Sequence, residues 1–333
     1  MDGGIALIGS GSATPTQILT NAQLGQRVET SDSWIVSRTG IAERRISAPE
    51  ESLVMLSHKA ASSALEMAGW HPSSIDLVLL ATSTPDDLFG SAPQVQANLG
   101  ATKAVAFDLT AACSGFLFAL ITAAQYLRNG TMRRALVIGA DQLTKWVDWD
   151  DRRSCVLFGD GAGAVALESS DFQDDGLIDF KLKSDGNRGD CLNLNQFGES
   201  LQLIDGISHQ KGGFRPIEMN GQEVYKFAVR EVPALLGELL KANKISSKSL
   251  DWLLLHQANQ RILDAVADRF DIPHEKVLSN LANYGNTSAA TIPLMLDEAV
   301  RDGRVKKGDL LATSGFGAGL SWGAALLRWQ GPF

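Results

Sequence analysis

Residues 75–80 read Ile-Asp-Leu-Val-Leu-Leu, and residues 250–255 read Leu-Asp-Trp-Leu-Leu-Leu, an offset of 175 positions (250 − 75). Each stretch is a short apolar run that follows an aspartate, a pattern that favours a buried strand. The runs are continuously apolar and do not alternate with polar residues. We therefore expect strands in a sheet that helices cover on both faces, which predicts an α/β fold.

Two further pairs of segments repeat at nearly the same spacing. The segment from Val105 to the Cys113 region resembles the segment from Val277 to the Asn286 region, at an offset of 172 (277 − 105). Leu136–Gly139 resembles Leu310–Thr313 in the same way. These near-constant offsets predict an internal duplication. The alternative is that any two α/β segments look alike at this level of pattern.

The chain has 333 residues, about twice a domain of roughly 150 residues. We expect two halves. The N-terminal half, over 1–170, carries Cys113 as the candidate nucleophile, and the region over 171–333 carries two further candidate site residues, His256 and Asn286. Around the boundary between the two, Ser169–Met219 is polar and predicts a connector with loops and a few strands. The expected strands and helices are Ile5–Ile8, Leu53–Ala68, Leu77–Ala81, Ala104–Phe107, Phe116–Leu127, Leu136–Gly139, Ala164–Leu167, Trp252–Leu255 and Ala289–Val300.

Composition limits the classes of function. Lys and Arg number 30 against 38 Asp and Glu, a net charge of −8, so nucleic-acid binding is not expected. Three scattered cysteines are too few for a disulfide framework or a CxxC metal site, which favours reduced thiols and a cytoplasmic location. The opening Met1–Gly4 lacks signal-peptide features, and no apolar run reaches the roughly 18 residues of a membrane span.

Cys113 is the strongest candidate nucleophile. It lies in Leu109-Thr110-Ala111-Ala112-Cys113-Ser114-Gly115-Phe116, between a predicted strand and a predicted apolar helix. The positive end of a helix dipole lowers the pKa of a nearby thiol and favours the reactive thiolate. Most free cysteines are inert core residues, and we assign that role to Cys155 and Cys191.

His256 and Asn286 are the candidate partners of this thiol. His256 directly follows the apolar strand Trp252–Leu255, and sites in α/β sheets form beyond the carboxyl ends of strands. Asn286 precedes the predicted helix Ala289–Val300, and the repeat places it within a residue of the position equivalent to Cys113. We therefore expect the three side chains to meet in one cleft, although a lone His or Asn is more often structural.

Glycine-rich turns give weaker signals. Gly315–Gly319 follows a strand and can present backbone N–H groups to an oxyanion, although on its own such a loop is more often only a tight turn. Gly9-Ser10-Gly11 looks like a dinucleotide loop, but Pro15 interrupts the helix that such a loop requires. Gly161-Ala162-Gly163 leads into a strand instead of a helix, and the sequon at Asn286 has no secretory context.

In order along the chain, these motifs resemble the beta-ketoacyl-acyl-carrier-protein synthase III family of thiolase-like condensing enzymes. The resemblance covers nearly the whole chain. Its residues are Thr30–Ile41, Ala112–Phe116, Phe158–Ala164, Asn220–Val229, His256–Asn259 and Asn283–Ser288. It implies a duplicated five-layered α-β-α-β-α fold and a homodimer. It also implies condensation of acetyl-CoA, or another short acyl-CoA, with malonyl-acyl-carrier protein, giving acetoacetyl-carrier protein, CoA and carbon dioxide in the first condensation of fatty-acid synthesis, without a cofactor or metal.

The resemblance also implies roles for individual residues. Cys113 would hold the acyl group, while His256 and Asn286 would hydrogen-bond the malonyl thioester oxygen, with His256 neutral. The backbone N–H groups of Cys113 and Ala318 would form the oxyanion hole; the family often has glycine at the second position. The remaining implied contacts are Thr30, Trp34, Arg38, Arg152 and Asn259 for CoA, Phe89 and Phe316 for the acyl pocket, and Lys226 and Arg261 for the acidic carrier protein.

Alternative functions remain compatible with the residues. A relative with the same fold could transfer acyl groups without decarboxylation or make secondary metabolites. A papain-like Cys-His-Asn hydrolase uses the same residue types, and a catalytically silent dimer is a further alternative. The net charge of −8 also requires that basic residues gather locally if an acidic carrier protein docks.

Overall fold

The computed structural model describes residues 3–171, 173 and 175–332, so Met1 and Asp2 lie outside the described residues. Within that part of the chain, two five-stranded sheets form the centre of the molecule. The first sheet has the order β1 (Gly3–Ala13), β7 (Gly161–Asp171), β6 (Arg134–Asp141), β4 (Leu77–Ala81) and β5 (Val105–Leu109). The second has the order β8 (Leu177–Ser184), β16 (Ser321–Arg328), β15 (Leu310–Gly317), β13 (Trp252–Leu255) and β14 (Val277–Leu278).

The two sheets have the same topology. In the first, β4 is parallel to both β5 and β6, and β7 is antiparallel to both β6 and β1. In the second, β13 is parallel to both β14 and β15, and β16 is antiparallel to both β15 and β8. Strand order and strand direction both match, so the predicted duplication is confirmed.

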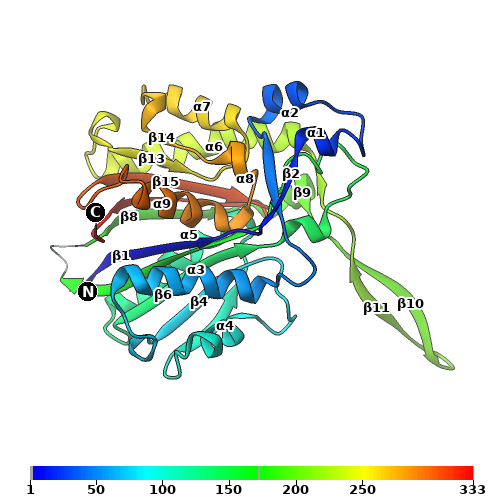
Figure 1. The fold of residues 1–333 in the computed structure, drawn as a ribbon, viewed down its shortest axis with the longest axis horizontal. Helices are drawn as coiled ribbons and strands as arrows, with labels where there is room; N and C mark the ends of the chain where they lie inside the picture. Colours follow the sequence, from blue (N-terminus) through cyan, green and yellow to red (C-terminus); the bar gives the residue numbers. More distant parts are fainter. Residues whose placement is uncertain (1–2, 172, 174, 333) are drawn as a thin grey trace.

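Helices separate and cover the sheets in five layers, α-β-α-β-α (Figure 1). α5 and α9 lie between the two sheets, α3 and α4 cover the outer face of the first, and α6 and α7 cover the outer face of the second. The bounds of these helices are α3 Leu53–Ala68, α4 Ala92–Leu99, α5 Gly115–Arg128, α6 Gly221–Ala242, α7 Gln260–Arg269 and α9 Thr291–Arg301.

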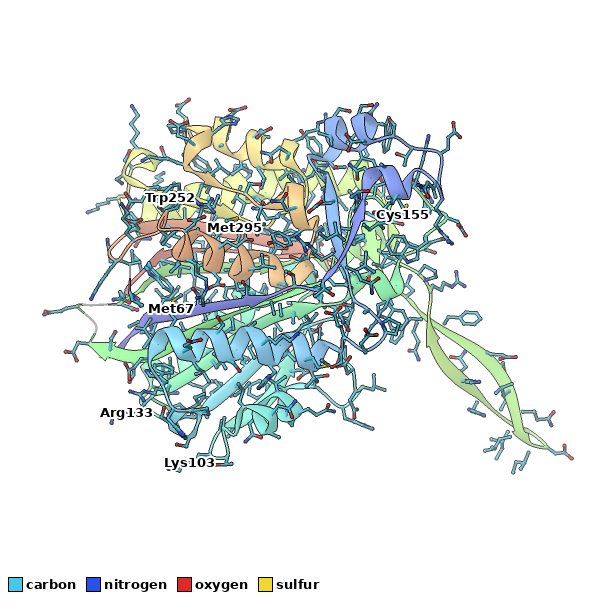
Figure 2. All side chains as sticks on the ribbon, in the orientation of Figure 1. Met67, Lys103, Arg133, Cys155, Trp252 and Met295 are labelled. Carbon is cyan, nitrogen blue, oxygen red and sulfur yellow. The ribbon has the colours of Figure 1, made fainter. Side chains whose placement is uncertain are left out.

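The apolar strands contribute buried side chains to the cores on both faces of each sheet. In β4, Leu77 and Leu79 point into the central layer, whereas Val78 and Leu80 point toward the outer helices. All four side chains are fully buried, and burying each one stabilises the fold by about 1.5–3 kcal/mol. Met295 on α9, labelled in Figure 2, belongs to the same central core. Burial on both sides explains why these strands read as continuous apolar runs.

The aspartate that precedes each repeated strand has the same structural role in both halves. Asp76 Oδ2 accepts a hydrogen bond from Arg134 N at 3.0 Å, and Asp251 Oδ2 accepts one from Leu310 N at 2.8 Å. Each carboxylate therefore clamps the start of the neighbouring parallel strand. These contacts pair Arg134 with Leu310, an offset of 176 (310 − 134), so the sequence comparison that paired Leu136 with Leu310 was two residues out of register.

The segment predicted as a connector contains more strand than expected. Its first strand, β8, completes the second sheet, and β9 (Leu192–Asn193) pairs with β12 (Glu218–Met219). Between them, β10 (Gln196–Ile204) and β11 (Ile207–Phe214) form a hairpin that projects from the body of the molecule (Figure 1). Large exposed apolar side chains on the hairpin are Phe197, Leu203, Ile204, Ile207 and Phe214.

A small cap covers the end of the sheets where the candidate residues lie. It contains α1 (Asn21–Leu24), α2 (Asp32–Thr39), α8 (Leu281–Tyr284) and the two-stranded sheet of β2 (Gln17–Thr20) and β3 (Glu43–Ile46). α2 begins at Ser31, whose hydroxyl accepts from Trp34 N, and ends at Gly40 in the left-handed conformation at φ 81°. The cap places Trp34 and Arg38 on one short helix facing the candidate site.

Candidate active site

Cys113 lies in a single 3₁₀ turn, η2 (Ala112–Ser114), between β5 and α5. Ala112, just before it, has a positive φ of 48°, an unusual conformation for a residue with a side chain. The Cys113 side chain is 7% exposed. The strand, turn and helix thus hold the thiol in a fixed position at the carboxyl end of the first sheet.

The second half contains the equivalent turn, η8 (Ser288–Ala290), before α9. Its first residue, Ser288, has φ 53°, matching Ala112. By this match Ala289 is the repeat partner of Cys113, at an offset of 176 (289 − 113), and Thr110 is the partner of Asn286. Asn286 thus lies three residues before the position equivalent to the thiol, which corrects the spacing inferred from sequence.

The two turns pack together because a glycine makes room for them. A Cβ at Gly139 in β6 would lie 2.1 Å from the Ala289 carbonyl oxygen, so no larger residue fits there. In the same region, the Ser288 hydroxyl lies 3.4 Å from Cys113 Sγ and donates a hydrogen bond to it. The candidate nucleophile of one half therefore contacts the turn of the other half directly.

Burial raises the pKa of the Cys113 thiol to about 12. The Ser288 hydrogen bond favours the thiolate and lowers this pKa, and the nearby Asp141 carboxylate raises it further. This direction is opposite to the one expected from the helix dipole. The physical reason is that the turn lies inside the protein, where loss of solvation of the thiolate outweighs its hydrogen bonds.

His256 follows β13 at the carboxyl end of the second sheet, and its backbone N–H donates to the Ser314 carbonyl at 2.9 Å. Its ring packs edge-on against Phe316, with centroids 5.3 Å apart. Burial lowers the pKa of His256 to about 3, so the imidazole is neutral at physiological pH. Nδ1 is buried without a hydrogen-bond partner among the described residues.

Asn286 is held by its backbone and by one end of its amide. Its N–H donates to the Leu157 carbonyl at 2.8 Å, and its carbonyl accepts from Gly159 N at 3.1 Å. Asn286 Oδ1 accepts from Ser288 N at 2.9 Å. Because Oδ1 is engaged in this way, Nδ2 is the end of the side chain that is available to donate to a substrate oxygen.

Cys113 lines two adjoining cavities. The smaller, about 320 Å³, also contains His256 and Asn286, so the structure brings the three predicted catalytic side chains to one cavity. The larger, about 710 Å³, is mainly apolar and contains Ser288, Ala318 and Phe89. The thiol therefore faces a polar compartment with the histidine and asparagine on one side and an apolar compartment on the other.

The loop after β15 approaches the nucleophile closely. A Cβ at Gly317 would lie 2.5 Å from Cys113 N, so only glycine allows this approach. Ala318, the next residue, lines the larger cavity and is not among the described non-glycine residues with positive φ. The methyl group that departs from the family's usual glycine is therefore accommodated without backbone strain.

The residues expected to bind CoA differ in their positions. Trp34, Arg38, Arg152 and Asn259 line the smaller cavity, whereas Thr30 is not among its lining residues. The guanidinium carbons of Arg38 and Arg152 lie 5.6 and 5.5 Å from the centre of the Trp34 ring. An adenine between Trp34 and Arg152 would need about 3.5 Å on each side, so the Arg152 guanidinium must shift outward to admit it.

Asn259 has a clear local role. It caps α7: its Oδ1 accepts from Arg261 N at 3.0 Å, and its Nδ2 donates to the Arg38 carbonyl at 3.0 Å. It therefore joins α7 to α2 at the rim of the smaller cavity. Phe316 lines that same cavity, against His256, whereas Phe89 lines the larger one and is 97% exposed.

The two residues expected to dock an acidic partner have different environments. Arg261 lines the smaller cavity and lies over Tyr225, with its guanidinium carbon 5.4 Å from the ring centre. Lys226 is exposed on α6 and pairs with Glu223 at 2.9 Å, which neutralises much of its charge. Arg230, on the same helix, pairs with Glu231 in the same way.

Sequence reasoning assigned no role to Asp141 or Ser288. Asp141 ends β6 and is fully buried beside the two turns. The signal that could have identified it is its position just beyond an apolar strand, the criterion that selected His256. Ser288 lies within the quoted motif Asn283–Ser288, but its contact with Cys113 depends on the packing of the two halves.

The described residues contain no group of three or more His, Cys, Asp or Glu side chains placed to hold a metal ion. Among these same residues, no helix is both long and apolar enough to cross a membrane.

Comparison with protein families gives two matches. Residues 107–186 match the model described as 3-oxoacyl-[acyl-carrier-protein] synthase III, and residues 240–329 match the model of its C-terminal part. Together they cover the strand–turn–helix segments that carry Cys113, His256 and Asn286.

Curated relatives are similar along almost the whole chain. The beta-ketoacyl-[acyl-carrier-protein] synthase III of Prochlorococcus marinus (strain MIT 9313) is 75% identical over 99% of this chain and 97% of its own length. The protein of the same name from Synechococcus sp. (strain WH7803) is 73% identical over the same shares.

Solved structures are similar in fold. The 3-oxoacyl-[acyl-carrier-protein] synthase III of Aquifex aeolicus VF5 has a TM-score of 0.89 at 41% identity, covering 98% of this chain and all of that one. The priming beta-ketosynthase of the R1128 polyketide pathway has a TM-score of 0.90 at 32% identity, covering 100% of this chain and 98% of that one.

Proposed function

Since the chain belongs to the beta-ketoacyl-acyl-carrier-protein synthase III family, we propose that Cys113, His256 and Asn286 carry out the reaction of that family. The chain is an acyltransferase that condenses a short acyl-CoA with malonyl-acyl-carrier protein and so initiates fatty-acid synthesis. This assignment sets aside the papain-like hydrolase. The arrangement that best supports the three residue roles is the single cavity that Cys113, His256 and Asn286 line together.

In the first half-reaction, Cys113 Sγ attacks the carbonyl carbon of acetyl-CoA. A bond forms between Sγ and the acetyl carbon, the bond to the CoA sulfur breaks, and CoA leaves as a thiolate that takes a proton from solvent. Backbone N–H groups of Cys113 and Ala318 stabilise the negative oxygen of the tetrahedral intermediate. The CoA arm occupies the smaller cavity, with Trp34, Arg38 and Arg152 near its mouth, and the acyl chain extends into the larger, apolar cavity.

In the second half-reaction, malonyl-carrier protein replaces CoA in the smaller cavity. The bond to the malonyl carboxylate breaks, carbon dioxide leaves, and the electron pair forms an enolate whose carbon attacks the acetyl carbonyl on Cys113. A carbon–carbon bond forms, the bond between the acetyl carbon and Cys113 Sγ breaks, and acetoacetyl-carrier protein leaves the Cys113 thiolate behind. His256 and Asn286 Nδ2 donate to the thioester oxygen where negative charge develops. A neutral imidazole suits this role because it donates a hydrogen bond without a fixed charge of its own.

The test is mass spectrometry of the protein mixed with acetyl-CoA. We expect one acetyl adduct on Cys113 and none in Cys113→Ala. His256→Ala and Asn286→Ala should still form the adduct but should release carbon dioxide from malonyl-carrier protein at a rate lower by about 100-fold or more. Acetylation of another residue, or full decarboxylation in both variants, would refute these assignments.

Two assembly features belong to the same proposal. Phe89 and Leu88 are 97% and 84% exposed beside the larger cavity, which supports a homodimer in which Phe89 closes the acyl pocket of the partner subunit. Arg261 at the mouth of the smaller cavity supports docking of the acidic carrier protein there, with Lys226 contributing once Glu223 is displaced. Sedimentation of the wild-type chain and of Phe89→Asp tests the dimer; a monomeric wild type would refute it.

The proposal includes a division of the chain into halves at residues 170 and 171, which the end of β7 at Asp171 and the start of β8 at Leu177 support to within a few residues. The Cys113 thiol and the other two free cysteines fit a reducing, cytoplasmic compartment. Acetyl-CoA and malonyl-carrier protein enter as substrates, and no other group is required by these steps.

A further inference from the structure

The reaction leaves open where the proton of the buried thiol goes. Cys113 reacts as a thiolate, but burial holds its pKa at about 12. His256, with a pKa of about 3, is a weak proton acceptor. Among the described residues, the side chain that hydrogen-bonds Cys113 Sγ is Ser288, at 3.4 Å. The path of the proton therefore begins at the Ser288 hydroxyl.

Asp141 lies on the other side of that hydroxyl. Its Oδ1 accepts from Thr82 Oγ1 at 3.1 Å, Ser83 N at 2.8 Å and Thr84 Oγ1 at 3.0 Å. Its Oδ2 accepts from Ala289 N at 3.1 Å. These bonds fix the carboxyl group between the two halves, and no lysine or arginine pairs with it in the part of the chain that the structure describes.

Asp141 is 0% exposed, and burial raises the pKa of its carboxyl group. A hydrogen bond from Ser288 contributes in the opposite direction. The Asp141 carboxylate is among the causes that raise the pKa of Cys113, and no cationic group is among the causes of either shift. A carboxylate in this setting gains a proton more readily than an exposed one.

Ser288 is held rigidly between these two groups. Its N–H donates to Asn286 Oδ1 at 2.9 Å, and its backbone has φ 53°. Its hydroxyl carries one proton but faces two acceptors, Cys113 Sγ and the Asp141 carboxylate. One hydroxyl cannot donate to both at once, so while it donates to Asp141 its lone pairs are free to accept from the thiol.

We propose that the Ser288 hydroxyl takes the proton from Cys113 Sγ and passes its own proton to Asp141, leaving a thiolate that attacks the acyl-CoA. The S–H bond breaks and an O–H bond forms on Ser288, while the original O–H bond of Ser288 breaks and one forms on Asp141. Charge is conserved, since one negative charge moves from carboxylate to sulfur. The proton stays on Asp141 during the acyl-enzyme stage and returns through Ser288 when condensation releases the thiolate.

This inference rests on Cys113 being the nucleophile, and the structure offers well-matched variants to test it. Ser288→Ala should fold, because the equivalent position in the first half, Ala112, already holds alanine at φ 48°. Asp141→Asn removes the proton acceptor. Ser10→Ala is the control, since Ser10 is also fully buried and donates to a buried carboxylate, Asp297, at 2.9 Å, and neither residue lines the two cavities.

The measurement is the single-turnover rate of Cys113 acetylation by acetyl-CoA, followed by mass spectrometry from pH 6 to pH 10. At pH 7 we expect Ser288→Ala and Asp141→Asn to be slower by about 100-fold, while Ser10→Ala matches the wild type. The deficit should shrink about tenfold per pH unit as solvent hydroxide takes over the deprotonation. A deficit that does not change with pH would show a structural role and overturn the relay.

Acetylation within about threefold of wild type in both variants would equally overturn it. A second measurement uses the wild-type protein and does not depend on either variant folding. In mixtures of light and heavy water, two protons moving in one step give a curved dependence of the acetylation rate on the deuterium fraction, and a straight line would contradict the relay. If Cys113 is not the nucleophile, the wild type forms no Cys113 adduct, a result that distinguishes failure of the proposed function from failure of the relay.

Discussion

The close approach of Gly317 to the nucleophile gives the sharpest prediction. In Gly317→Ala the new Cβ would lie 2.5 Å from Cys113 N and 3.1 Å from both Ala112 Cβ and Cys113 Cβ. Ordinary contacts begin at 3.4 Å, so β15 and η2 must separate by about 0.9 Å (3.4 − 2.5). The crowded atom is a backbone nitrogen that cannot rotate away, so the whole turn has to move.

A movement of that size should disturb chemistry more than folding. The shifted N–H group is one of the two proposed oxyanion donors, and a displacement of about 1 Å can cost about 100-fold in rate. Overpacking of a buried site typically costs about 1–3 kcal/mol, so the variant should fold with a lowered Tm. The assay is single-turnover acetylation of Cys113, with Tm measured by calorimetry on the same samples.

Gly315→Ala is the matched control on the same strand. Its Cβ would meet Ile292 Cδ1 at 3.3 Å and Leu117 Cδ1 at 3.5 Å, both at the ends of flexible side chains. We expect its acetylation rate to stay within about threefold of wild type. The reasoning fails if Gly317→Ala acetylates as fast as Gly315→Ala, because the oxyanion donor would then tolerate the shift or would not be Cys113 N.

Further outcomes follow from the electrostatics of the site. Folded His256 has a pKa of about 3, against 6.5 when unfolded. Lowering the pH from 7 to 5 should therefore lower the unfolding free energy of the wild type by about 2 kcal/mol more than that of His256→Gln. Equal losses in denaturant titrations of the two proteins would contradict this. Arg152→Ala should raise the KM for acetyl-CoA about tenfold by removing a guanidinium from the Trp34 ring. Arg304→Ala is the unaffected control, since Arg304 pairs with Asp302 and lines neither cavity. Arg261→Glu should raise the KM for malonyl-carrier protein about tenfold and weaken the dependence of this KM on salt concentration. Lys307→Glu should change neither the KM nor its salt dependence. Equal effects of the two charge reversals would place the docking surface elsewhere.

The strands and central helices were predictable because burial on both faces leaves a plain signal in the sequence. β4 and β13 are continuously apolar, and α5 is apolar on nearly every side because it lies between two sheets. The predicted element Leu53–Ala68 is a helix with these bounds, and it ends there because Gly69 takes the left-handed conformation at φ 67°. Residues that are close together in the sequence determine where such helices and strands begin and end.

Features that depend on the packing of distant segments were not predictable. The thiol pKa moved in the opposite direction from the helix-dipole expectation because burial of Cys113 is set by the other half of the chain. The sequence predicted the segment of the β10–β11 hairpin only as part of a polar connector. Neither strand has a buried face, so apolar and polar residues do not alternate along them as they do in a half-buried strand. Register within the repeat was misjudged by two or three residues because it is fixed by the Asp76 and Asp251 clamps and not by apolar pattern.

The equivalence of the two turns has an evolutionary consequence. A pair of identical ancestral chains assembled in this way would have been symmetric and could have carried two reaction centres. In the present chain Ala289 stands where the second thiol would be and Thr110 where the second amide would be. One such set of side chains therefore remains, with the proposed nucleophile on one half and the proposed hydrogen-bond donors on the other. Ala289 has a structural role in the present chain, because its backbone N–H donates a hydrogen bond to Asp141. Under the proposed mechanism neither half could act alone, because each turnover would need side chains from both.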